Sequence, residues 1–169
     1  MTTTIAESEK RQRLTDLIAD FHTAMLVTRT GEGGLRARPL AIADNRGDGA
    51  LYFATAVDSG KVNDLQADTQ VNVSMQDKHR FVSVTGRAHI ETERPLIDRL
   101  WSESWKVWFP KGKDDPSLCI VVVDPTEASY WDMTGGEGLR YWFESAKAYV
   151  KGTRPDSDND ERHVAHVKL

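Results

Sequence analysis

The 169-residue sequence has a single cysteine, Cys119, so a disulfide within one chain and a cluster of thiolate metal ligands are both excluded. Cys119 lies in the apolar run CIVVV (119–123), a setting that predicts a buried structural thiol. Long hydrophobic runs are missing too: none approaches the roughly 20 apolar residues of a membrane-spanning helix. The first residues, MTTTIAESEKRQR, lack the apolar stretch of a secretion signal. We therefore expect a cytoplasmic protein without a membrane partner.

An excess of positive charge is also absent. The formal net charge is -4, and the 22 lysines and arginines are scattered along the chain. Nucleic-acid binding depends on clustered cations that neutralise phosphates. The charge pattern therefore excludes a nucleic-acid partner and favours a small-molecule ligand.

The hydrophobic pattern predicts a mainly β (α+β) protein with one domain over residues 1–169, of which 1–9 form a flexible start. Predicted strands cover 24–30, 35–43, 50–55, 70–76, 80–91, 118–125, 127–132 and 163–169, and predicted helices cover 7–21, 58–68, 94–105 and 139–150. Pro39 restricts the second strand to an edge or a bulge. An antiparallel sheet of this size must close or cover its edges, so we expect a barrel flanked by short helices.

Three short motifs suggest an anion site: RARPL (36–40), YFAT (52–55) and SGK (59–61). A phosphate monoester needs concentrated hydrogen-bond donors and positive charge, which a helix start, two hydroxyls and two cations together supply. Those side chains would be Arg38, Thr55, Ser59 and Lys61. Spacing alone favours a plainer interpretation, in which Asp58 or Ser59 only caps the helix and the cations are solvated.

The order of RARPL, LYFAT, DSGKVNDL, VNVS, RFVSVTGRA and ASYWD resembles the pyridoxamine 5'-phosphate oxidase-like FMN-binding split barrels. Within them, the segment WFPKG followed by DDPSL (108–118) is similar to the general stress protein branch. The resemblance covers roughly residues 10–169. It implies an antiparallel split β-barrel homodimer that binds FMN, or FAD as a possible alternative, between its subunits.

The resemblance also implies the cofactor-binding residues. It places Arg38, Pro39 and Leu40 along the flavin and Thr55, Ser59 and Lys61 at the phosphate, with Ala54 also in contact. Trp131 matches the aromatic position that approaches the flavin from the other subunit. The remaining tryptophans are predicted to be core or dimer-contact residues: Trp101, Trp105, Trp108 and Trp142.

Three departures from the oxidases count against oxidation of pyridoxamine phosphate. Ala43 stands where the oxidases have a lysine, and TGGEGLR (134–140) replaces their Arg-x-His segment. The chain ends in HVAHVKL (163–169) without the arginine signature of the oxidases. We therefore do not expect efficient oxidation of that substrate.

The expected function is that of an FMN-binding flavoprotein that resembles general stress proteins. If it is an enzyme, it would be an FMN-dependent oxidoreductase that exchanges electrons with a small-molecule redox partner. No catalytic side chain is evident, and no metal site is expected, because His163 and His166 point to opposite faces of a strand. One alternative is a non-catalytic flavin-binding stress-response protein that acts as a reservoir, sensor or docking module. Another is a different cofactor, such as FAD, deazaflavin or haem, although the lack of a well-placed histidine argues against haem.

Overall fold

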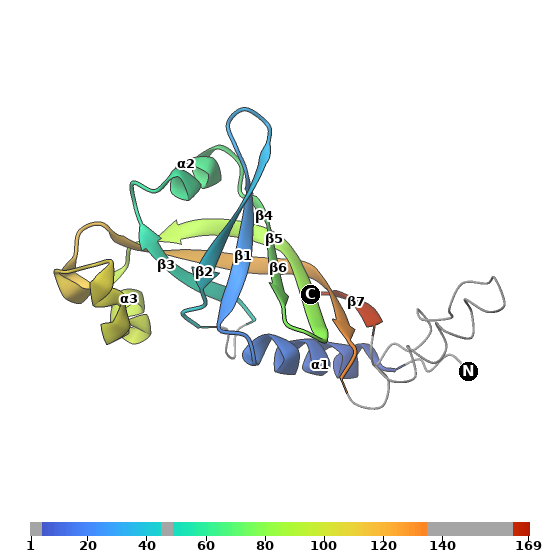
Figure 1. The fold of residues 1–169 in the computed structure, drawn as a ribbon. Coiled ribbons are helices and arrows are strands. Elements are labelled where there is room, and N and C mark those ends of the chain that lie inside the picture. Colours follow the sequence, from blue (N-terminus) through green and yellow to red (C-terminus); the bar gives the residue numbers. More distant parts are fainter. Residues whose placement is uncertain (1–4, 45–48, 135–163) are drawn as a thin grey trace.

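The computed structural model describes residues 5–44, 49–134 and 164–169 (Figure 1). The predicted helix at 139–150, with Trp142, lies outside these residues, as does His163. Three α-helices are present in the described part: α1 (Glu7–Ala19), α2 (Gly60–Ala67) and α3 (Arg94–Leu100). Two short 3₁₀ helices follow α3, namely η1 (Glu103–Val107) and η2 (Gly112–Asp114). The strands are β1 (Thr23–Arg29), β2 (Leu35–Ala41), β3 (Leu51–Ala56), β4 (Gln70–Gln76), β5 (Arg80–Glu91), β6 (Leu118–Asp132) and β7 (Val164–Lys168).

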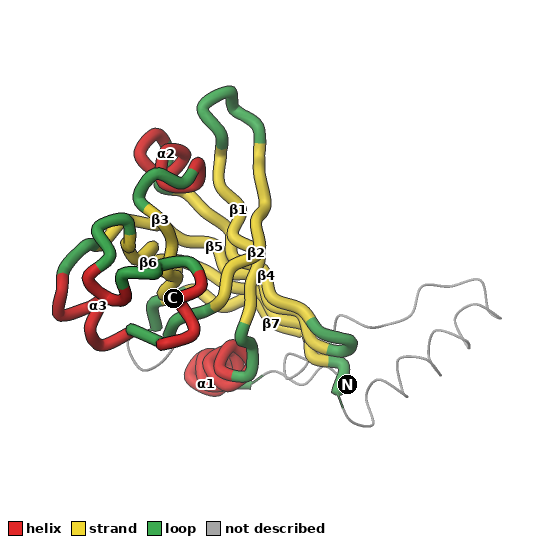
Figure 2. Tube along the Cα trace, turned by 60° about the vertical axis from the view of Figure 1, so that its left-hand side comes forward, coloured by secondary structure: helices red, strands yellow, loops and turns green. Residues whose placement is uncertain are grey.

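All seven strands belong to one antiparallel sheet with the order β2-β1-β4-β5-β6-β3, and β7 pairs with the second half of β6. This confirms the prediction of a mainly antiparallel sheet with short helices. The bridge between Asp44 and Tyr52 connects the segment after β2 to β3, so the two end strands of the sheet meet there. Pro39 lies in the edge strand β2, as predicted. Helices α2 and α1 lie near opposite ends of the sheet in both backbone views (Figures 1 and 2).

The prediction of two strands at 118–125 and 127–132 is wrong, because β6 runs through both. Pro125 lacks a backbone N–H, so it cannot donate a hydrogen bond to the ladder. In the structure Pro125 lies opposite Gly86, where the register between β5 and β6 shifts at Thr85/Gly86. A β-bulge accommodates a residue that cannot join the regular ladder, so the strand continues past it.

The main core lies between the sheet and α1. Side chains alternate along β1, β4 and β5 between a buried face and a more exposed one, with Leu26, Val73 and Val84 fully buried. A second cluster lies on the other face of β3 and β6, where α3 packs Ile97 and Leu100 against this sheet surface. Residues 118–123 are consequently buried on both faces, which explains their unbroken apolar run.

Cys119 lies within this doubly covered segment. It is free and buried, its thiol contacts the carbonyl oxygen of Thr55, and burial raises its pKa to about 11. The structural thiol expected from the sequence is thus confirmed.

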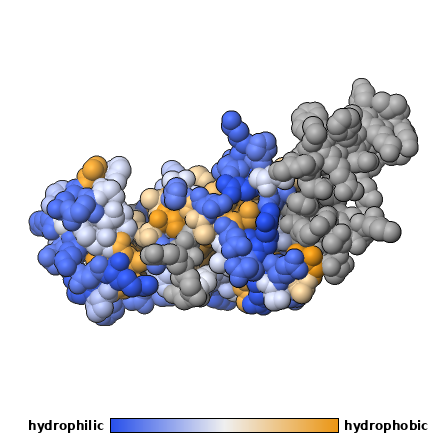
Figure 3. Space-filling model, turned by 90° about the horizontal axis from the view of Figure 1, so that it is seen from below, coloured by the Kyte–Doolittle hydropathy of each residue, from blue (hydrophilic) through white to orange (hydrophobic). Residues whose placement is uncertain are grey.

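The predicted helix at 94–105 ends earlier, at Leu100. Trp101 adopts an extended conformation, and its ring meets that of Trp105 edge to face at 5.7 Å, so that both pack against the second cluster. Trp108 is 77% exposed and is not a core residue. Seen from below, the described surface is mainly hydrophilic with separate hydrophobic spots (Figure 3). None of the helices in the described part of the chain has the length and apolar character needed to cross a membrane.

The turn between β4 and β5 leads to a prediction about acid stability. The Asp77 carboxylate accepts hydrogen bonds from the backbone N–H groups of His79 and Arg80 and from the Arg80 side chain. These bonds, that from His79 foremost, lower the Asp77 pKa to about 2. A depressed pKa in the folded state stabilises the fold above the unfolded value of about 4, and this contribution disappears as the pH falls toward 2.

We therefore expect Asp77→Asn to melt a few degrees lower than the wild type at pH 7. The difference should shrink as the pH falls from about 4 toward 2, because the wild-type carboxylate is then protonated. Thermal unfolding followed by circular dichroism across this range measures it. A difference that stays constant with pH would show that the carboxylate charge does not carry the effect.

Candidate functional site

Three predicted anion-binding side chains come together where β3 ends and α2 begins. Thr55 is buried near the end of β3, and its Oγ1 accepts a hydrogen bond of 2.9 Å from Lys61 Nζ. The Ser59 hydroxyl lies 3.4 Å from the same oxygen. A short chain segment from a strand into a helix therefore gathers two hydroxyls and one ammonium group.

The plainer interpretation of these residues does not hold for Ser59 and Lys61. Ser59 occupies the N-cap position of α2, but its side chain makes no capping hydrogen bond. Lys61 is half-buried rather than fully solvated. Burial, followed by the charge of Arg38, lowers the pKa of Lys61 below its usual value, although Cys119 opposes this shift. Ser59 and Lys61 therefore differ from a capping serine and a solvated lysine.

Arg38 of β2 is held at this site by two neighbours. One of its terminal nitrogens donates to Thr28 Oγ1 at 2.7 Å, and the other donates to Asp64 Oδ2 at 2.6 Å. The Thr28 hydroxyl in turn donates to Asp64 Oδ2 at 2.8 Å. The hydrogen bond from Arg38 is the largest cause of the lowered pKa of Asp64. Asp64 is therefore ionised at neutral pH and compensates the guanidinium.

The donor set fits a phosphate group. Lys61 and Arg38 supply two positive charges against the single carboxylate of Asp64. Thr55 and Ser59 add hydroxyls, and α2 begins with backbone N–H groups and the positive end of its dipole. A phosphate monoester carries several acceptor oxygens and nearly two negative charges, so it is complementary to this arrangement.

The other predicted residues on β2 and β3 are Pro39, Leu40 and Ala54. Pro39 is exposed on β2 and lies opposite Met25, and Leu40 is half-buried against the main core. Ala54 precedes Thr55 in β3, so its side chain points to the other face of the sheet, where it packs on the second cluster. The structure thus does not bring the Ala54 side chain together with Thr55, Ser59 and Lys61.

Trp131 is far from Thr55 along the paired strands β3 and β6. Thr55 pairs with Cys119, and Trp131 lies twelve positions farther along the strand, up to about 40 Å for an extended chain. Trp131 pairs instead with Phe81 in β5, close to α1, and the two side chains are 38% and 39% exposed. Phe81 was not singled out from the sequence, although the alternation of strand 80–91 places it on the exposed face.

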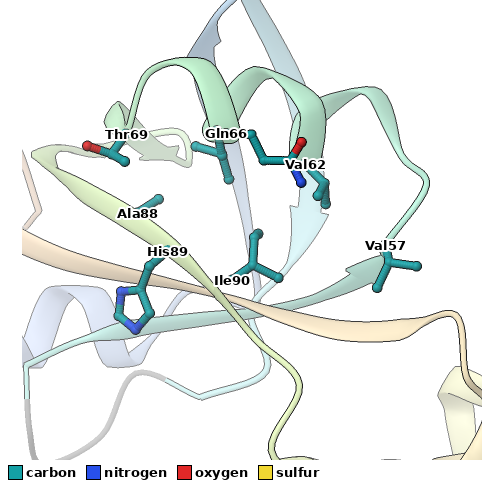
Figure 4. A pocket seen from close by; sticks show the side chains of 8 residues that line it. Val57, Val62, Gln66, Thr69, Ala88, His89 and Ile90 are labelled. Atoms are coloured by element: carbon teal, nitrogen blue, oxygen red, sulfur yellow. The ribbon is translucent and has the colours of Figure 1, made fainter.

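A pocket that the sequence did not reveal lies between α2 and β5 (Figure 4). Its volume is about 370 Å³, within the range of ligand pockets. His89 lies in its wall, with Nδ1 3.2 Å from Asp124 and Nε2 3.4 Å from Glu91. The lining is mostly aliphatic and consists of Val57, Val62, Leu65, Gln66, Thr69, Ala88, His89 and Ile90. Within residues 5–44, 49–134 and 164–169, no three His, Cys, Asp or Glu side chains gather as metal ligands would.

Comparison with known proteins matches residues 9–156 to the family described as pyridoxamine 5'-phosphate oxidase like. General stress protein 26 of Bacillus subtilis is 26% identical over 127 residues, which cover 72% of this chain and 87% of that protein. The general stress FMN/FAD binding protein of Xanthomonas citri has a solved structure with a TM-score of 0.63 and 26% identity, covering 77% of this chain and 92% of that one. A structure described as a general stress protein 26 from Jannaschia sp. CCS1 has a TM-score of 0.71 and 24% identity, covering 97% and 100%, and shows the shared fold.

Proposed function

Because the chain belongs to the pyridoxamine 5'-phosphate oxidase-like family, we propose that it is a flavoprotein that binds FMN, with the phosphate held by Thr55, Ser59 and Lys61. The observation that carries this proposal is the cluster of these three side chains beside Arg38. The FMN/FAD-binding relative from Xanthomonas citri supports a flavin as the phosphate-bearing ligand. FMN ends in the monoester that the cluster fits, whereas in FAD this group is esterified further.

The second part of the proposal is a split-barrel homodimer with the flavin between its subunits. Arg38, Pro39 and Leu40 would run along the ring, and Trp131 would approach it from the partner chain. The separation of Trp131 from Thr55 along β6 supports a contribution from a second chain, because one FMN molecule cannot span it. The exposed aromatic pair of Trp131 and Phe81 supplies apolar surface for such a contact. Sedimentation that shows a monomeric FMN complex would contradict this part.

Bound FMN would supply hydride and single-electron transfer between a small-molecule donor, such as NAD(P)H, and an acceptor. Arg38 would stabilise negative charge on the ring by its fixed guanidinium. Ala43 supplies no ammonium group for pyridoxal phosphate, and it packs against the second cluster beside Tyr52. This position favours a substrate other than pyridoxamine phosphate. It equally suits the second candidate, a stress-response flavoprotein without turnover.

The visible absorption spectrum of freshly purified protein tests the cofactor, with mass spectrometry of the molecule released on denaturation. We expect flavin bands and released FMN, and reduction of the bound flavin on addition of NAD(P)H if the protein is an oxidoreductase. Released FAD would show that the bound cofactor is FAD rather than FMN. A bound flavin that no donor reduces would favour the non-catalytic candidate. A colourless protein that also does not bind added FMN would overturn the proposal.

A further inference from the structure

Asp64, Arg38 and Thr28 form a closed ring of three hydrogen bonds that joins three elements of the fold. The acceptor oxygen Asp64 Oδ2 on α2 receives a bond from Arg38 on β2 and another from Thr28 on β1. Arg38 completes the ring by donating to Thr28. Thr28 is fully buried, and the Asp64 and Arg38 side chains are only 11% and 18% exposed, so the ring is largely shielded from water.

An ion pair that is largely shielded from water needs an explanation beyond stability. Removing a carboxylate and a guanidinium from water costs free energy that their attraction roughly offsets, and apolar side chains of similar size often pack as well. What the ring does provide is a fixed guanidinium. A free arginine side chain populates many rotamers, and ordering it on ligand binding costs free energy. Here that ordering is complete before any ligand arrives.

Asp64 shares helix α2 with the second cation of the site, Lys61. Lys61 and Asp64 are three residues apart on α2, so one helical turn carries both an ammonium and a carboxylate. Arg38 acts on Lys61 strongly enough to contribute to its lowered pKa. The Asp64 carboxylate bonds directly to Arg38, so it compensates one of the two positive charges of the site.

We propose that Asp64 is a positioning residue that aims Arg38 at the bound FMN, an inference that rests on the proposed function. Arginine has five N–H donors, and the ring occupies one on each of the two terminal nitrogens of Arg38. The remaining N–H groups stay available for the ligand. Asp64 itself touches no ligand in this arrangement and acts through Arg38 alone.

A double-mutant cycle on FMN affinity tests the inference. We expect Arg38→Gln and Asp64→Asn each to weaken FMN binding by about tenfold, in the range for hydrogen bonds to charged groups. The double variant should bind no more weakly than Arg38→Gln alone, because Asp64 has no effect once its target is gone. Quenching of flavin fluorescence in a titration measures all four constants.

The neighbouring carboxylate Asp68 provides a matched control. Asp68 follows α2 and accepts from Arg29 Nε of β1 at 3.1 Å, so it also ties this helix to the same strand. Asp68→Asn should leave FMN affinity within about twofold, since it does not contact Arg38. Equal losses in Asp68→Asn and Asp64→Asn would show that anchoring of α2 is the cause and would overturn the inference.

The remaining outcomes are also decisive. Losses that add in the double variant, or an unchanged affinity in Asp64→Asn, would overturn the role of Asp64 while FMN binding by the wild type stands. A wild-type protein that does not bind FMN would refute the proposed function itself. If Asp64→Asn does not fold, Thr28→Val takes its place in the cycle, because Thr28 is the third member of the hydrogen-bonded ring. Thr28→Val should then weaken FMN binding on its own, but it should cause no further loss in a protein that already carries Arg38→Gln.

Discussion

Replacement of Lys61 by methionine is expected to weaken FMN binding by about hundredfold. Lys61 Nζ bonds to Thr55 in a half-buried position beside Ser59, where a phosphate would meet a charged donor. Hydrogen bonds to charged groups contribute about 1.5–3 kcal/mol, and each 1.4 kcal/mol is tenfold in affinity. Methionine keeps the unbranched stem, so the loss reports the ammonium group rather than the packing of the chain.

Riboflavin provides the ligand control for this experiment, because it has the flavin ring without the phosphate. Its affinity should be the same in Lys61→Met and the wild type within about twofold. Lys78→Met is the matched protein control, since Lys78 is exposed in the turn between β4 and β5. Equal losses for FMN and riboflavin would place Lys61 at the ring, and undiminished FMN affinity would refute the phosphate assignment.

The predicted site residues that the structure brings together lie close to one another in the sequence. Thr55, Ser59 and Lys61 lie within seven residues, so a strand that runs into a helix almost compels their proximity. Arg38 was also predicted, but its partners were not. Asp64 reaches Arg38 only because α2 packs against β1, the neighbour of β2 in the sheet, and no sequence period encodes that packing.

The strands were predictable for a related reason. Alternation of apolar and polar residues depends on neighbours two positions apart, and it located β1, β4 and β5 to within one residue. The register between two strands, by contrast, depends on residues that can be far apart in the sequence. The sequence therefore did not reveal that Phe81 faces Trp131, nor that Pro125 meets a bulge rather than ending the strand.

Gly86→Ala is expected to lower the free energy of unfolding by about 3 kcal/mol, at the upper end of the usual range for overpacking. A Cβ atom at this position would lie 2.4 Å from the carbonyl oxygen of Asp124 and 3.1 Å from Cα of Pro125. Both atoms belong to the backbone of β6, so no side chain can move aside. In a protein of this size the loss corresponds to roughly 10 °C in Tm, measurable by circular dichroism.

The effect should extend beyond local packing, because the bulge at Thr85/Gly86 lies between the two halves of β6. The first half pairs with β3, which carries Thr55, and the second half carries Trp131. Gly31→Ala is the matched control: Gly31 has no heavy atom within 4 Å of the new Cβ and no positive φ, so its Tm should stay the same or rise slightly. A Gly86→Ala protein that melts within about 2 °C of the wild type would mean that the β6 backbone can shift at Asp124 to accommodate the new Cβ atom. It would also mean that the bulge does not fix the two halves of β6 relative to each other.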